Sequence, residues 1–189
     1  MSKIIEIRWH GRGGQGAVTA AKLFAETSLA IGKYIQAFPE YGPERMGAPV
    51  KAFDRISDTP IKTHSQVYNP DVVVIIDPTL IGTENVTEGL SPGGSLIANT
   101  PKDPQVLKKE LGLTSQKVYT VDATKISLET LGKFLPNTPM LGALIKATGL
   151  VDIEKACHEV KQMFAGKLKE ELIEGNIKAI KRAYEEIKG

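Results

Sequence analysis

The sequence predicts an α/β fold, with a mixed, largely parallel sheet flanked by helices and further helices at its C-terminal end. First, residues 71–77 form an apolar run bracketed by two aspartates, which is typical of a parallel strand covered on both faces. Second, strand-like and helix-like segments alternate up to about residue 121, as they do in α/β proteins. Third, the last third of the chain has helical spacing. We expect one domain over residues 1–189, because no linker or repeat divides the chain.

Composition excludes several classes of function. The net charge is +2 and 24% of the residues are charged, with lysines and glutamates interleaved after Asp152, so the sequence favours neither nucleic acid nor a membrane surface as partner. A single cysteine, Cys157, rules out an internal disulfide and an iron–sulfur cluster held by this chain alone. We expect a cytoplasmic protein, because the first residues do not resemble a signal peptide and no apolar run reaches about 18 residues.

The elements follow in order along the chain. Strands are expected at residues 4–9, 34–38, 50–56, 71–77, 95–98 and 117–121. Helices are expected at residues 17–31 and near 103–111. Thr138 is expected to cap the next helix, with Pro139 at its first position and Gly149 ending it, and Asp152 to cap another with apolar residues at helical spacing. A final helix contains Ile177 and Ile187. The proline-rich stretch 33–63 can insert antiparallel strands into the sheet.

A glycine loop between the first strand and the first helix is the strongest candidate site. It consists of Gly11, Arg12, Gly13, Gly14, Gln15 and Gly16, and so matches the pattern G-x-G-x-x-G between a strand and a helix. Glycines let the backbone approach a ligand closely, and the helix N-terminus offers unpaired N–H groups to an anion. Arg12 adds a positive charge. The loop therefore suits a phosphate group, and the alternative is a tight turn without a ligand.

A nicotinamide cofactor would need an acidic residue about 20 positions further on, at the end of the second strand, to hold the ribose hydroxyls. The second strand here ends in Ala37, Phe38 and Pro39, and Glu40 comes late and beyond the proline. The acid is missing or displaced, which argues against a free-standing NAD-dependent oxidoreductase.

The sequence offers no catalytic set. Cys157 lies on the apolar stripe of a helix and is expected to be a buried structural thiol. His10, beside the glycine loop, is expected to bond to backbone rather than to act in a site. Asp77 precedes Pro78 at the end of a strand, where α/β proteins place ligand groups, but capping the following turn is the role we expect. The three histidines lack the spacing of metal ligands, so we expect no metal site in this chain.

Three segments together resemble the gamma subunits of 2-oxoacid:ferredoxin oxidoreductases. Residues 5–18 resemble their opening, residues 36–50 resemble their second signature in the form of the pyruvate branch (pyruvate synthase), and residues 137–144 resemble their late helix. The resemblance covers essentially the whole chain. Met46 stands where relatives often carry another residue.

The resemblance implies a multi-subunit enzyme of anaerobic metabolism. It decarboxylates a 2-oxoacid oxidatively with coenzyme A and reduces ferredoxin, or runs the reverse carboxylation. In this family thiamine diphosphate and magnesium are carried by other subunits, and [4Fe-4S] clusters by the beta and delta subunits. The implied partners are the alpha, beta and delta subunits, with ferredoxin as electron acceptor. The chain agrees, since it has one cysteine and lacks the Gly-Asp-Gly signature of thiamine diphosphate sites.

The resemblance also assigns a role near the active site to the gamma subunit, and the residues fit coenzyme A. Its phosphates are suitable ligands for the glycine loop and Arg12. Tyr41, Glu44 and Arg45 lie in a proline-rich loop with residue types favoured at interface centres, so we expect a subunit contact there, an ordinary exposed loop being the alternative. A non-catalytic scaffold remains the other alternative for the chain.

Overall fold

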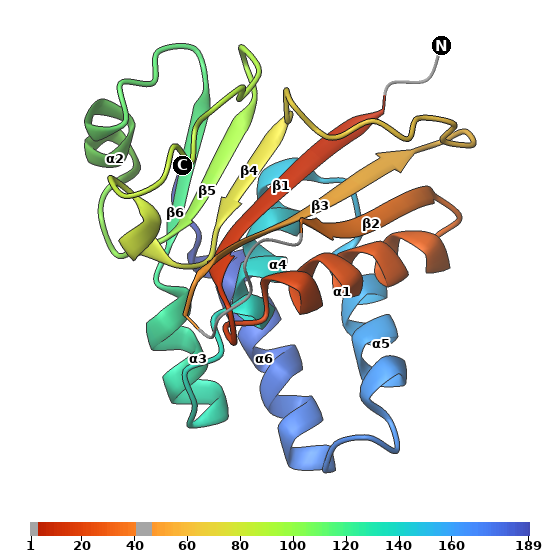
Figure 1. Cartoon of the computed structure of the whole chain (residues 1–189). Coiled ribbons are helices and arrows are strands. Elements are labelled where there is room, and N and C mark those ends of the chain that lie inside the picture. Colours follow the sequence, from red (N-terminus) through yellow and green to blue (C-terminus); the bar gives the residue numbers. More distant parts are fainter. Residues whose placement is uncertain (1–3, 41–46) are drawn as a thin grey trace.

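The computed structural model describes residues 4–40 and 47–189, and within them six strands form one mixed sheet in the order β2-β3-β1-β4-β5-β6. The strands are β1 (Ile5–Arg12), β2 (Tyr34–Glu40), β3 (Pro49–Ser57), β4 (Val72–Ile75), β5 (Ser95–Asn99) and β6 (Lys117–Val121). The helices are α1 (Ala17–Ala30), α2 (Pro104–Glu110), α3 (Ala123–Leu131), α4 (Asn137–Thr148), α5 (Ile153–Phe164) and α6 (Glu170–Glu186), with a short 3-10 turn η1 (Pro78–Leu80). The predicted fold class is confirmed (Figure 1).

The sheet has a parallel half and an antiparallel half. Strands β1, β4, β5 and β6 run parallel, while β3 pairs antiparallel with both β1 and β2. The prediction that residues 33–63 insert antiparallel strands is therefore confirmed. The hairpin β2–β3 extends the sheet beyond β1, so the second strand of the chain lies at the edge and not beside the first.

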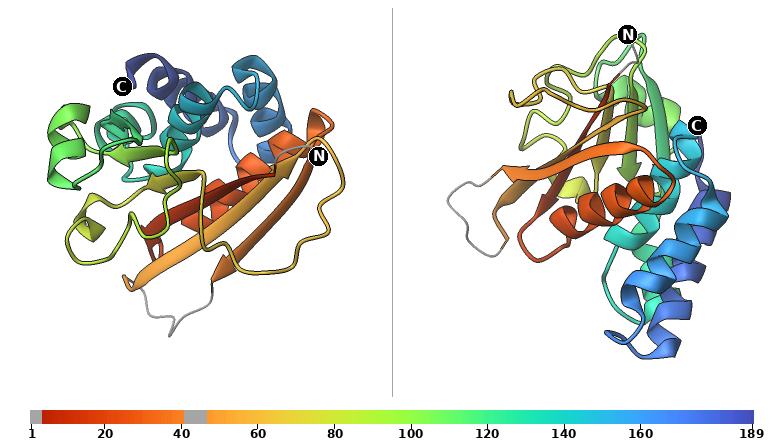
Figure 2. Two further views of the ribbon diagram at one scale, coloured as in Figure 1. Left: turned by 90° about the horizontal axis from the view of Figure 1, so that it is seen from above. Right: turned by 90° about the vertical axis from the view of Figure 1, so that its right-hand side faces the viewer.

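Both faces of the sheet are covered. Helices α1, α3, α4, α5 and α6 pack on one face, while η1, the segment after it and α2 cover the other (Figure 2). Strand β4 contributes to both cores: Val72 and Val74 belong to the helical side, and Val73 and Ile75 to the other. This is the burial on both faces that its uninterrupted apolar sequence predicts.

Asp71, just before β4, fixes the register of β4 against β1 through two hydrogen bonds to Glu6. The N–H of Asp71 donates to the carbonyl of Glu6 at 2.8 Å, and the Asp71 carboxylate accepts the Glu6 N–H at 3.0 Å. Strand β6 forms one edge of the sheet, and the end of the chain pairs with it: Lys188 and Thr120 exchange two backbone hydrogen bonds of 2.9 Å.

Helix α4 runs through the centre of the helical layer, and every residue from Asn137 to Ile145 is buried. Gly142 allows α4 to touch α6 backbone to backbone, since a Cβ added there would lie 2.1 Å from the carbonyl oxygen of Ile180.

The start of α4 differs from the prediction. Pro136 holds the N-cap position and no side chain caps the helix, whereas Thr138 lies inside it. The C-terminal stop at Gly149, in the left-handed region with φ 63°, is confirmed.

Candidate functional site

The glycine loop is a tight turn from the end of β1 into α1. Gln15 folds back over it: its N–H donates to the Arg12 carbonyl at 3.0 Å, and its side-chain oxygen accepts the Arg12 N–H at 2.9 Å. Gly14 and Gly16 have φ of 93° and 80°, a conformation that residues with a Cβ rarely adopt. These two glycines are therefore required by the turn itself.

Part of the loop pairs with its own chain. The Gly13 N–H donates to the Ala48 carbonyl at 2.9 Å, and the Gly47 N–H donates to the Gly13 carbonyl at 3.2 Å. These bonds continue the ladder between β1 and β3 beyond Arg12 and Pro49. The ladder leaves Gly14 to Gly16 as the part of the loop that leads into α1.

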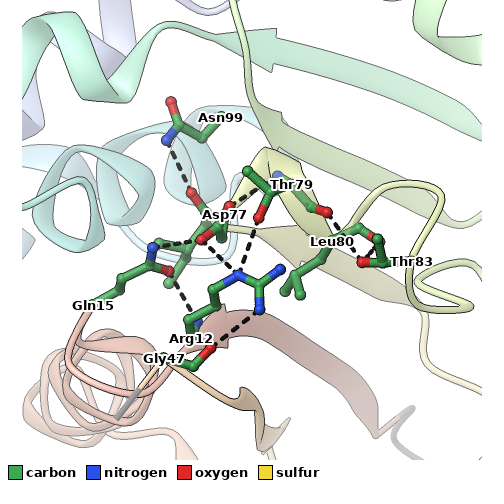
Figure 3. Close-up of polar contacts among 9 residues, drawn as sticks. Arg12, Gln15, Gly47, Asp77, Thr79, Leu80, Thr83 and Asn99 are labelled. Carbon is green, nitrogen blue, oxygen red and sulfur yellow. Dashed lines mark hydrogen bonds and ion pairs between the residues drawn. The ribbon is translucent and has the colours of Figure 1, made fainter.

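The Arg12 side chain is held by three groups around the loop, and Figure 3 shows the cluster. Its Nε donates to the Thr79 hydroxyl at 3.0 Å and lies 3.3 Å from the Asp77 carboxylate, while Nη1 donates to the Gly47 carbonyl at 3.1 Å. Nη2 makes no hydrogen bond to any described residue, and the side chain is 29% exposed. Within the described part of the chain, the guanidinium is thus held through Nε and Nη1, and Nη2 has no partner.

Asp77 contacts three other residues of this cluster, Arg12, Gln15 and Thr79. Its carboxylate accepts the Thr79 N–H at 2.8 Å, which caps η1, and also accepts a hydrogen bond from the Gln15 amide. Burial by itself would raise the pKa of Asp77, but hydrogen bonds from Thr79 and Gln15 and the charge of Arg12 together hold it below its ordinary value. The expected turn cap is confirmed. Asp77 also holds Arg12 and Gln15 in place. The sequence did not reveal this role, because these residues are 65 and 62 positions away.

The cluster lies at the topological switch point of the sheet. After β1 the chain passes to the face that carries α1, and after the adjacent parallel strand β4 it passes to the face that carries Leu80 and the rest of that core. In open α/β sheets, ligands bind at the carboxyl ends of two such strands. Arg12 is the last residue of β1 and Asp77 comes shortly after β4, so the cluster spans this crevice.

The start of α4 lies against the start of α1. A Cβ added to Gly16 would meet the carboxamide of Asn137, with Nδ2 at 2.8 Å and Cγ at 2.9 Å. Gly16 is the N-cap residue of α1 and, like Pro136 at α4, provides no side-chain cap. Sequence reasoning placed Asn137 only in a family motif, because nothing local indicates that it reaches residue 16.

His10 lies in β1 rather than in the loop, and its ring makes no hydrogen bond to backbone among residues 4–40 and 47–189, so that expectation is wrong. It belongs to β1, where side chains alternate between the faces, and it lies with Arg8 on the face opposite α1. The Arg8 Nε donates to its Nε2 at 2.9 Å. Burial, followed by the charges of Arg8 and Lys51, lowers the pKa of His10 to about 3, so the ring is neutral at physiological pH.

Cys157 is buried on α5, as expected, and burial raises the pKa of its thiol to about 11. A thiol of this kind is a poor nucleophile at neutral pH. Within residues 4–40 and 47–189, no three His, Cys, Asp or Glu side chains are grouped to bind a metal ion. The same part of the chain has no helix with the length and apolarity to cross a bilayer. Tyr41, Glu44 and Arg45 lie outside the described residues.

The sheet order bears on the nicotinamide alternative. In the dinucleotide-binding fold the acid at the end of the second strand lies next to the glycine loop. Here β3 separates β2 from β1, and Glu40 pairs with Lys51 of β3. An acid at the end of β2 is therefore about two strand spacings, roughly 10 Å, from β1.

Comparison with known proteins identifies the family of the chain. Residues 6–186 match the family described as pyruvate ferredoxin/flavodoxin oxidoreductase. Pyruvate synthase subunit PorC of Thermotoga maritima is 50% identical over 98% of this chain and 96% of its own. The pyruvate/ketoisovalerate oxidoreductases common subunit gamma of Pyrococcus abyssi is 51% identical over 96% of each chain. The crystal structure of the pyruvate oxidoreductase subunit PORC from Thermotoga maritima superposes with a TM-score of 0.86 over 98% of both chains, at 47% identity. The chain therefore belongs to the pyruvate ferredoxin/flavodoxin oxidoreductase family, as one of its gamma subunits.

Proposed function

We propose that this gamma subunit binds one phosphate group of coenzyme A at its glycine loop, while the chemistry of the oxidoreductase takes place on other subunits. The observation that carries the proposal is the position of the loop, at the switch point of the sheet and at the N-terminus of a 14-residue helix without a side-chain cap. Coenzyme A, the co-substrate of this enzyme class, carries a pyrophosphate and a 3′-phosphate.

The geometry of Arg12 supports a phosphate contact of moderate strength. Nε and Nη1 are held by Thr79, Asp77 and Gly47, which leaves Nη2 for a ligand. One charge-assisted hydrogen bond contributes about 1.5–3 kcal/mol, and a helix dipole about 0.3–1 kcal/mol. Asp77 offsets part of the attraction, because its charge lies 3.3 Å from Nε. The loop thus suits one contact within a site shared between subunits.

The remaining parts of the enzyme are assigned to partner chains. Thiamine diphosphate, magnesium and the [4Fe-4S] clusters are proposed to lie on the alpha, beta and delta subunits, with ferredoxin as the electron acceptor of a cytoplasmic complex. One cysteine in the whole chain is consistent with this division. Pyruvate is the proposed 2-oxoacid. The Pyrococcus relative is named as common to pyruvate and ketoisovalerate oxidoreductases, which favours a choice of substrate made on other subunits.

The test is Arg12→Ala in the assembled enzyme. Loss of 1.5–3 kcal/mol raises the KM for coenzyme A roughly 10- to 150-fold, while the KM for pyruvate stays within about twofold. Arg12→Lys recovers part of the effect, since it keeps the charge without the forked geometry. Arg182→Ala is the matched control, because Arg182 is also ion-paired and is 25% exposed, but on α6. An intact Arg12→Ala complex with unchanged coenzyme A dependence would remove this assignment.

A scaffold role is the second candidate, and the hydrogen bonds of Gly13 to residues 47 and 48 favour it. The same hairpin leads into the loop of Tyr41, Glu44 and Arg45, which we propose as a subunit contact. In that case Arg12→Ala weakens assembly, and all kinetic constants change together. Size-exclusion chromatography of the mutant complex separates the two roles.

A further inference from the structure

We propose that Asp54 is a pH-dependent switch of the hairpin β2–β3: as a neutral acid it lets the hairpin close against α1, and its ionisation at alkaline pH loosens the hairpin. The inference does not depend on the coenzyme A proposal. It starts from a carboxyl group that lies in an apolar core. Asp54 is 0% exposed, and its Oδ1 has no hydrogen-bond partner among the described residues.

The surroundings of Asp54 favour the neutral acid. Its Oδ2 accepts the indole N–H of Trp9, which is also 0% exposed, at 2.7 Å. The side chain lies in the core beneath α1, with Ile7 of β1 and Ala37 of β2 as its cross-strand neighbours. An unpaired charge in such a place costs far more than the neutral group does. Burial accordingly raises the pKa of Asp54 well above its ordinary value, and the hydrogen bond from Trp9 lowers it only in part.

Among the described residues, no charged group is placed to compensate an ionised Asp54. Strand β3 packs chiefly against β1, β2 and α1. The ionisable residues of α1, Lys22 and Glu26, are exposed. The other ionisable residues of the three strands alternate onto the opposite face of the sheet: Glu6, Arg8, His10, Arg12, Tyr34, Glu40, Lys51 and Arg55. The carboxylate that forms when the proton leaves to solvent is therefore unpaired, and only water can stabilise it.

The acid does more than serve Trp9. A buried indole needs one acceptor, and the carboxamide oxygen of an asparagine would supply it without a group that titrates. The carboxyl group adds a charge that depends on pH. This charge is what couples the core beneath α1 to the solution.

The hairpin is the part of the sheet that opens most readily to water, because β2 is an edge strand and only β1 and α1 hold the hairpin to the rest of the fold. Its movement reaches the glycine loop. The Gly13 N–H donates to the Ala48 carbonyl at 2.9 Å, and Nη1 of Arg12 donates to the Gly47 carbonyl at 3.1 Å. Both acceptors directly precede β3. Ionisation of Asp54 therefore also loosens the segment that holds Arg12.

The first test measures the charge of Asp54 in the purified full chain. At neutral pH the wild-type chain is expected to show the infrared carbonyl stretch of a protonated carboxylic acid, and Asp54→Asn to lack it. Trp9 is the only tryptophan of the chain, so its fluorescence reports on the hydrogen bond to Asp54. As the pH is raised, the emission of the wild-type chain shifts to longer wavelength when water reaches the indole, and that of Asp54→Asn does not.

The second test is hydrogen exchange, with wild type and Asp54→Asn compared at the same pH so that the intrinsic exchange rates cancel. At alkaline pH the amides of β2 and β3 in the wild-type chain are expected to lose at least about tenfold in protection relative to the variant, equivalent to about 1.4 kcal/mol. The amides of β5 and β6 keep theirs. Asp58→Asn is the matched control, since Asp58 directly follows β3 but is 71% exposed and ion-paired with Lys33, and it behaves like the wild type.

Three results would overturn the switch. Absence of the protonated-acid band from the wild-type chain at neutral pH would show that Asp54 is already charged, a result that needs no variant to fold. Equal protection of β2 and β3 in the wild type and Asp54→Asn at alkaline pH would leave a buried acid that moves nothing. Equal loss of protection in all six strands would show unfolding of the whole chain and not an opening of the hairpin.

Discussion

Two glycines in one loop allow the contact between the starts of α1 and α4 to be measured. Gly14→Ala and Gly16→Ala both place a Cβ at a positive φ, of 93° and 80°. At Gly14 the new methyl group meets nothing within 4 Å, whereas at Gly16 it lies 2.8 Å from Nδ2 of Asn137. The two substitutions therefore share the backbone cost and differ in the contact.

The expected magnitudes follow from these distances. A left-handed conformation costs an L-residue about 1–2 kcal/mol, so Gly14→Ala lowers the free energy of unfolding by that amount. Gly16→Ala adds about 0.5–1.5 kcal/mol, because Asn137 must leave its rotamer. For a chain of this size, 1 kcal/mol corresponds to about 2–4 °C in Tm. Gly14→Ala is thus expected to lose about 2–8 °C, and Gly16→Ala about 1–6 °C more.

Urea unfolding of the purified chain, followed by circular dichroism, measures both variants, and the midpoints are compared at equal m-value. A third variant, Gly16→Ala with Asn137→Ala, removes the opposing side chain and is expected to recover the additional loss but not the backbone cost. Equal destabilisation by Gly14→Ala and Gly16→Ala, or no recovery in the double variant, would refute the contact between residues 16 and 137.

Four further outcomes are expected. The isolated chain, assayed with pyruvate, coenzyme A and a viologen dye, is expected to show no turnover and no iron–sulfur absorbance; robust turnover would contradict its role as a subunit. NAD and NADP are expected to bind more weakly than a low-micromolar Kd, about −8 kcal/mol, by calorimetry, and tighter binding would revive the dehydrogenase alternative. Gly142→Ala is expected to lower the free energy of unfolding, measured in urea, by about 3 kcal/mol, at the upper end of overpacking costs, because the added Cβ would clash with the backbone carbonyl of Ile180 on α6; a loss below about 1 kcal/mol would contradict that packing. Burial raises the pKa of Asp54 well above its ordinary value despite a hydrogen bond from Trp9, so the folded state binds the proton more tightly and stability falls as pH rises above about 4; Asp54→Asn is expected to flatten this slope, and an unchanged slope would exclude Asp54 as its source.

The sequence predicted the fold correctly where the signal for an element lies within that element. The apolar run of β4 and the cap of α5 by Asp152 are local signals, and both are confirmed. Helix α3 was missed although Asp122 caps it and Gly132 ends it, because its threonines, serine and isoleucine have weak helix propensity and packing against α6 stabilises it.

The candidate site was predicted only in its local part. The G-x-G-x-x-G pattern located the turn, and the positive φ of Gly14 and Gly16 accounts for it. The sequence could not show that Asp77 binds Arg12, or that Asn137 covers Gly16, because those contacts depend on which strands are adjacent and where α4 begins. The prediction for His10 was wrong because β1 extends three residues beyond the predicted strand and includes the first two residues of the loop.

The hydrogen bonds between Asp71 and Glu6 have a consequence for how the sheet assembles. A strand that is apolar on both faces loses little when it slips by one residue, since valines and isoleucines exchange places between two equally apolar cores. The two hydrogen bonds between Asp71 and Glu6 exist in one alignment only, so they distinguish the native pairing from its neighbours. The same alignment places Asp77 opposite the end of β1, where Arg12 and Gln15 meet it. Correct strand pairing during folding is thus also what assembles the ligand loop, and a misaligned molecule would be compact but unable to hold Arg12.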